Sequence, residues 1–109
     1  MALKFIATTE FLTAGEGGRR HPARQGYQPL LHFPGDDFYL DLVVPSFRNE
    51  AGEPYNKGEV LPSTVTAVFT VHNAAAEDIL RRRLSIGTTL ELTEGTRVVG
   101  KVHVTSIVQ

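Results

Sequence analysis

The sequence contains no cysteine, which excludes disulfide bonds, thiolate metal sites and a cysteine nucleophile. It also has no long hydrophobic run. Its first twelve residues include Lys4 and Glu10 among the apolar side chains, so they lack the unbroken apolar core of a signal peptide. From these absences we expect a cytoplasmic protein with no membrane-spanning segment.

Excess charge is missing as well, because the net charge of the 109 residues is only −1. A nearly neutral domain is not held on nucleic acid by its mean field, although a local cationic patch can still bind phosphate. Hydrophobic residues make up 41% of the chain and charged residues 21%, which is typical of a folded globular protein. Length and composition together predict a single domain over residues 1–109.

The common catalytic motifs are absent. There is no phosphate-binding Gly-x-x-x-x-Gly-Lys-Ser/Thr loop, no His-Glu-x-x-His and no Gly-x-Ser-x-Gly, so nucleotide hydrolysis is not expected. The four histidines are spread over the chain without metal-ligand spacing, and we expect no metal and no cofactor. The adjacent acids Asp36 and Asp37 follow Pro34 and Gly35, a setting typical of a turn. We therefore expect the protein not to be an enzyme.

Residues 15–29 form the most distinctive stretch, which we call the cationic loop. It holds four glycines and two prolines, so neither hydrophobic period can be maintained, together with three arginines and one histidine. Long loops in small domains tend to carry function, because ordering them costs conformational entropy. The alternative is a solvated loop whose arginines only maintain solubility.

Period-two alternation of apolar residues predicts six short strands, and one helical pattern lies among them. Asn73 can cap a helix over residues 74–84, with acids near its start and arginines near its end. Glu94 and Gly95 form the turn of the last hairpin, with Gly95 expected at positive φ.

The fold class that follows is all-β: a small closed six-stranded antiparallel β-barrel with one short helix. The predicted strands cover residues 3–11, 30–33, 38–44, 65–71, 88–93 and about 98–104, and the predicted shared core contains Leu42, Phe69, Val98, Val102 and Val104.

Three short motifs resemble a known family. Residues 16–19 read Glu-Gly-Gly-Arg, residues 26–29 read Gly-Tyr-Gln-Pro, and residues 94–100 read Glu-Gly-Thr-Arg-Val-Val-Gly. In order and spacing they resemble the C-terminal (third) β-barrel domain of translation elongation factor Tu, over nearly the whole chain. The sequence departs from the family at Gln28, where the family has arginine, at residues 62–64, where it has Pro-Gly-Asp, and in the additional helix.

The resemblance implies a non-enzymatic domain. In the family this domain packs on the GTPase and middle domains, helps to hold the T stem of aminoacyl-tRNA and binds the exchange factor. We therefore expect a stand-alone binding module that binds no GTP itself. Its partner would be a protein or a tRNA-like RNA, and it would act as a regulator, decoy or immunity-type protein. The expected partner-binding residues are Arg19, Arg20, His21, Arg24, Tyr27, Gln28 and Arg97.

Two other functions remain open. One is a small hydrolase-like enzyme on the barrel, with His21, Asp36 or Asp37 as acid/base groups. The other is a structural subunit that self-assembles through the acidic segment of residues 46–63. For the cationic loop itself, we expect Arg19, Arg20 and Tyr27 to lie together near Arg97 on an exposed side; alternatively, its arginines pair with Asp36, Asp37 or Glu94.

Overall fold

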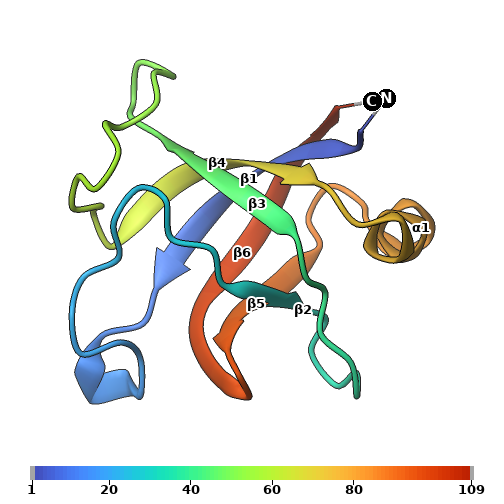
Figure 1. The fold of residues 1–109 in the computed structure, drawn as a ribbon, viewed down its shortest axis with the longest axis horizontal. Coiled ribbons are helices and arrows are strands. Elements are labelled where there is room, and N and C mark those ends of the chain that lie inside the picture. Colours follow the sequence, from blue (N-terminus) through green and yellow to red (C-terminus); the bar gives the residue numbers. More distant parts are fainter. Residues whose placement is uncertain (1, 109) are drawn as a thin grey trace.

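The computed structural model describes residues 2–108 and is built mainly from one antiparallel sheet of six strands (Figure 1). Across the sheet the strands follow the order β2-β5-β6-β1-β4-β3. The prediction of six antiparallel strands and one α-helix is confirmed. In chain order the elements are β1 (Lys4–Phe11), the 3-10 helix η1 (Ala14–Glu16), β2 (Leu30–His32), β3 (Val43–Arg48), β4 (Thr64–Val71), α1 (Ala74–Arg83), β5 (Thr89–Glu94) and β6 (Arg97–Val108).

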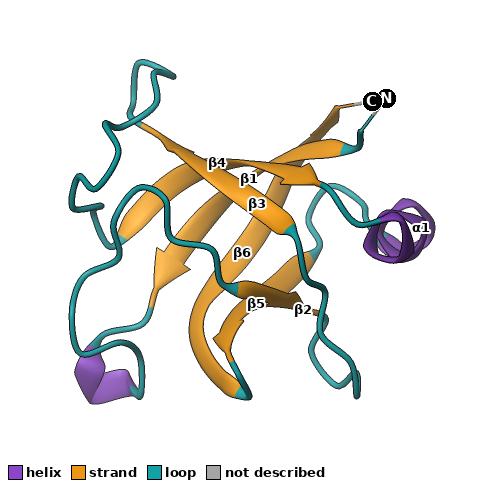
Figure 2. Cartoon of the chain, in the orientation of Figure 1, coloured by secondary structure: helices purple, strands orange, loops and turns teal. Residues whose placement is uncertain are grey.

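The predicted closure of the barrel is wrong. The sheet is an open half-barrel that turns through 205°, with β2 and β3 as its outer strands. Closure needs a hydrogen-bonded ladder between those two strands, but β2 has only three residues. A single bridge, in which Leu31 and Leu40 exchange two backbone hydrogen bonds of 3.0 and 2.7 Å, extends β2 on its outer side. Loops cover the rest of the opening (Figure 2).

The third strand lies further along the chain than predicted. We expected residues 38–44, ending at Pro45, whereas β3 runs through Pro45 to Arg48. Proline is tolerated there because β3 pairs with β4 only, so its outer side needs no N–H donor. The alternation fails before β3 because Leu42 adopts φ 56°, in the left-handed region that side chains disfavour.

The core lies inside the curve of the sheet. Phe69 of β4 stacks on Phe5 of β1 with a centroid distance of 4.9 Å, and both rings are fully buried. Val102 and Val104 are also buried, as predicted. The other two predicted core residues are not: Leu42 is 50% exposed, and the residue at position 98 is only half-buried.

A bulge in the last hairpin explains the second error. Leu92 pairs with Gly100 but Thr93 pairs with Val98, so Val99 is an extra residue and takes the buried position instead. The turn itself is as predicted. Gly95 has φ 60°, and Glu94 pairs with Arg97 across it.

Helix α1 packs on the opposite side of the molecule from the cationic loop (Figure 1). The Asn73 side chain accepts hydrogen bonds from the first-turn amides, as expected of a cap, and Ala76 and Leu80 are the buried residues of the helix. The three consecutive arginines at its end do not form a free phosphate site, because each pairs with a carboxylate: Arg81 with Glu77, Arg82 with Asp78 and Arg83 with Asp36.

Candidate functional site

The cationic loop is ordered from its first turn. Thr13 and Glu16 form a reciprocal capping box: Thr13 Oγ1 accepts from the Glu16 amide at 3.2 Å, and Glu16 Oε1 accepts from the Thr13 amide at 2.9 Å. The resulting 3-10 turn ends at Gly17, which has φ 91°. Gly18 then passes so close to Leu12 that a Cβ would lie 2.3 Å from the Leu12 carbonyl oxygen. Glycine at positions 17 and 18 is thus required by the path of the backbone.

Gln25 fastens the middle of the loop to the outer edge of β3. Its Nε2 donates to the carbonyls of Phe47 and Tyr55, both at 3.1 Å, and its Oε1 accepts from the Phe47 amide at 3.0 Å. The side-chain amide therefore serves Phe47 as a neighbouring strand would. The Gln25 backbone is held as well, by hydrogen bonds with Glu59 and Gly58. This role could not be predicted from the sequence, because nothing local distinguishes Gln25 from the exposed Gln28.

Glu94 fastens the far end of the loop to the last hairpin. Its carboxylate is 3.0 Å from Arg19 Nε and 3.0 Å from Arg97 Nη2, and it accepts a hydrogen bond from the Tyr27 hydroxyl. The Arg19 guanidinium also lies over the Tyr27 ring, 4.3 Å from its centroid. We call these four residues the Glu94 cluster. The expectation that Arg19 and Tyr27 lie near Arg97 is therefore met, with the partly buried Glu94 carboxylate at their centre.

Burial and contacts within the cluster shift the pKa values of Glu94 and Tyr27. Partial burial acts to raise the pKa of Glu94, but the hydrogen bonds from Tyr27 and Arg97 and the charge of Arg19 outweigh it, so this pKa is lowered. Burial and the hydrogen bond to Glu94 raise the pKa of the Tyr27 hydroxyl far above its usual value. The cluster thus stays in one protonation state, with an ionised carboxylate and a neutral phenol, through the neutral pH range. A constant protonation state is expected of a cluster that holds the loop in place.

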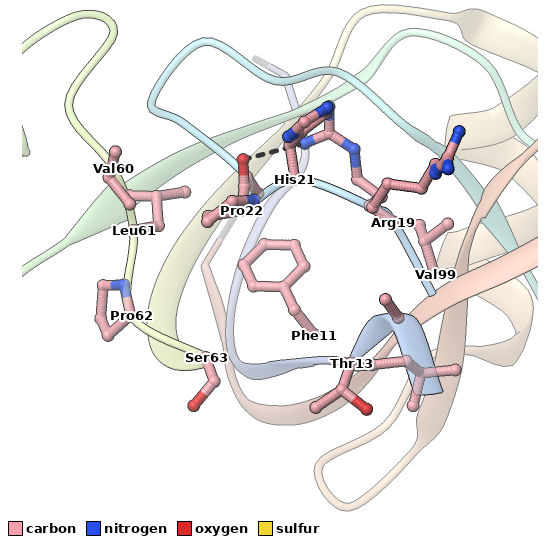
Figure 3. A pocket seen from close by; sticks show the side chains of 14 residues that line it. Phe11, Thr13, Arg19, His21, Pro22, Val60, Leu61, Pro62, Ser63 and Val99 are labelled. Atoms are coloured by element: carbon pink, nitrogen blue, oxygen red, sulfur yellow. Dashed lines mark hydrogen bonds between the residues drawn. The ribbon is translucent and has the colours of Figure 1, made fainter. Parts of the chain in front are cut away.

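A groove of about 340 Å³ opens between the start of the cationic loop and residues 60–63. We call it the loop groove. Figure 3 shows the Phe11 ring inside it, between the Val60–Pro62 wall and Val99, with His21 above. Sequence patterns did not indicate this groove, because its walls lie about 40 residues apart in the chain. Its apolar lining consists of Phe11, Leu12, Val60, Leu61, Pro62 and Val99, and Arg19, Arg20 and His21 also line it.

The predicted binding residues thus divide into groups. Arg19, Tyr27 and Arg97 belong to the Glu94 cluster. The Arg24 side chain donates to the Gly58 carbonyl at 3.0 Å and helps to fix the loop. Within residues 2–108, the exposed side chains of Arg20, His21 and Gln28 form no hydrogen bond or ion pair. Only the first two of these three line the loop groove.

The proposed acid/base residues are not assembled into one site. Asp36 pairs with Arg83 of α1 at 2.6 Å, and no Asp or Glu lines the loop groove beside His21. A different histidine has a carboxylate partner: His32 is buried, with Nδ1 2.8 Å from Glu91 Oε1 and Nε2 2.8 Å from the Asp36 carbonyl oxygen. The hydrogen bond to Asp36, and then that to Glu91, raises the pKa of His32.

We expect the stabilisation by His32 to weaken as pH rises. A raised folded-state pKa means that the contribution is complete below the unfolded pKa of about 6.5 and is lost as pH passes the folded pKa. The neighbouring basic residues are Arg83, which pairs with Asp36, and Lys101, which lies opposite Glu91 in the sheet. Urea unfolding of the wild type and of His32→Gln at about pH 6 and about pH 8.5 measures the effect. The difference in free energy of unfolding should be smaller at the higher pH; a pH-independent difference contradicts the assignment.

A scan against protein-family models found no match for this chain. Among the described residues, no three His, Asp or Glu side chains gather in a way that could hold a metal ion. No helix in residues 2–108 is long and apolar enough to cross a membrane. The site must therefore be judged on its own geometry.

Proposed function

We propose that this chain is a non-enzymatic binding module that recognises a protein partner through the cationic loop. One observation carries the proposal. The loop is fastened at three places, by the capping box, by Gln25 and by the Glu94 cluster, yet it presents Arg20, His21 and Gln28 to solvent without partners among residues 2–108. The loop is already ordered in the free protein, so binding costs little further conformational entropy. A partner therefore binds a preorganised surface.

The charge distribution favours protein over RNA. Arg19 and Arg97 share Glu94, and the whole chain carries a net charge of −1. Few cations of the loop remain for phosphates, and each phosphate contact adds only a salt-sensitive increment of affinity. The Tyr27 ring, which could stack on a base, is covered by Arg19. The resemblance to the third domain of elongation factor Tu supports a partner that recognises that factor, with the module as its regulator or decoy.

A charge-reversal pair tests the proposal. We expect Arg20→Glu with His21→Glu to abolish capture of the partner from an extract of the source organism, with the thermal midpoint unchanged. Arg19 is left intact, because a glutamate there would face Glu94 and disturb the fold. The matched control is Lys4→Glu with His72→Glu, which makes the same charge change at two exposed residues away from the loop.

The same experiment with ribonuclease separates the partner classes. A protein that is retained after digestion, lost with the loop pair and kept with the control pair supports the proposal. Loss of capture on digestion shows that the partner is RNA. Equal capture by the loop pair and the control pair contradicts a functional cationic loop.

A further inference from the structure

The loop groove combines an apolar interior with an uncompensated positive edge. Val60 remains 45% exposed at one wall, although it is large and hydrophobic. Leu61, the next residue in the chain, and Val99, on the other side of the Phe11 ring, are both buried. Figure 3 shows lining side chains on both sides of this space, with the Phe11 ring between them. A bulky apolar side chain from outside would shield Val60 from water, which is favourable in proportion to the area covered.

The charge at the groove has one sign. No Asp or Glu lines the groove, whereas Arg19, Arg20 and His21 do. Arg19 is neutralised by Glu94, which leaves Arg20 and His21 as exposed donors without partners among the described residues. This local positive charge stands out in a protein whose net charge is −1. An occupant that carries carboxylates is therefore complementary to the edge of the groove.

Size and chemistry together define the occupant. A hollow of about 340 Å³ holds one large side chain and a short stretch of backbone, well below the surface that a folded domain buries. Nucleic acid fits poorly, because the apolar walls offer nothing to phosphates and, among the described residues, Arg20 is the one arginine of the groove without a carboxylate partner. We propose that the loop groove binds an extended protein segment, with an aromatic or aliphatic side chain in the hollow and a flanking carboxylate on Arg20 and His21. This inference rests on the proposed function and specifies its partner.

Short peptides test it directly. The probes are the acetylated, amidated pentapeptide Ser-Glu-Phe-Glu-Ser, its counterpart with lysine for glutamate, and its counterpart with glycine for phenylalanine. In proton–nitrogen correlation spectra of the full chain, the first peptide should shift the amides of Leu12 and of residues 60, 61 and 63. Its affinity should exceed that of either counterpart by about tenfold, the value of one good charged or apolar contact.

Two variants locate the binding. Val60→Glu should lower the affinity for the acidic peptide by about tenfold, because it places a negative charge in the wall of the groove. Ile86→Glu, which changes a more exposed hydrophobic residue outside the groove, should leave it unchanged. If Val60→Glu does not fold, Arg20→Glu replaces it. Equal binding of the lysine peptide, or equal losses with both variants, overturns the inference.

The outcome is separable from that of the proposed function. If the loop pair loses a captured protein but the peptides do not bind the groove, the binding module stands and this occupant is wrong. If the groove amides shift with a ten-nucleotide RNA and not with the acidic peptide, the groove recognises RNA and the inference is also wrong. If the acidic peptide binds as expected while capture is the same with the loop pair as with the control pair, only the proposed function fails.

Discussion

Replacing Phe69 by alanine is expected to lower the free energy of unfolding by ~3–5 kcal/mol. The ring is fully buried and stacks on Phe5 with an interplanar angle of 10°. It belongs to β4, which is paired on both sides, by β1 and by β3. The backbone therefore cannot move inward to fill the space that the ring leaves, so the cavity persists. Urea unfolding monitored by circular dichroism measures the loss.

Phe38→Ala provides the matched control. Phe38 is 45% exposed, so its replacement should change stability by no more than about 0.5 kcal/mol. A similarly small loss for Phe69→Ala would mean that the two faces of β4 are inverted relative to the structure. A large loss for Phe38→Ala would mean that the Phe38 side chain packs in the core rather than against solvent.

Alternation of apolar residues predicted β1, β2, β4 and β5 closely, whereas β6 extends four residues further than predicted. It placed β1 and β4 within one residue of each end, and it placed Phe69 in the core. It failed at Val98, because the bulge at Val99 breaks the alternation between Val98 and the correctly predicted Val102 and Val104, and both residues at the bulge are valine. Bulges are set by pairing with a neighbouring strand, which a local pattern does not contain.

The outer strand β3 was predicted less well. Proline was taken to end a strand, but it ends one only where both sides need donors, and the sequence alone did not show that β3 is an outer strand. The same lack of information on strand pairing explains why a closed barrel was predicted. Six strands are compatible with either a barrel or an open sheet, and the choice depends on whether β2 and β3 pair with each other, which alternation within one strand does not reveal.

For the candidate site, composition located the cationic loop but not its contacts. Glycines and arginines are local signals, and the glycines that let the loop fold back onto the sheet were the basis for predicting that Arg19, Arg20 and Tyr27 lie near Arg97. The partners that hold the loop, Gln25 and Glu94, act over 22 to 75 residues of separation and carry no local signal. The open alternative, that an arginine of the loop pairs with Glu94, is correct for Arg19.

Gln25→Ala is expected to cost ~2–4 kcal/mol, the second largest effect, because three hydrogen bonds are lost together. Phe47 is on an outer strand, so no other backbone replaces the amide oxygen that accepts its N–H. The Phe47 side chain is fully buried, which limits how far this part of β3 can shift to reach water. Hydrogen exchange at the Phe47 amide should accelerate in the variant beyond the change in global stability.

Gln28→Ala is the matched control within the same loop. Gln28 is exposed and has no side-chain partner in the part of the chain that the structure describes, so its loss should stay within about 0.5 kcal/mol. Three residues thus separate a glutamine that completes the edge of a sheet from one that only faces solvent. If both variants lose the same stability, or if Phe47 exchange follows global unfolding in Gln25→Ala, then Gln25 does not act as the surrogate strand. The loop would in that case depend on the capping box and the Glu94 cluster alone, and its surface would be less preorganised for a partner.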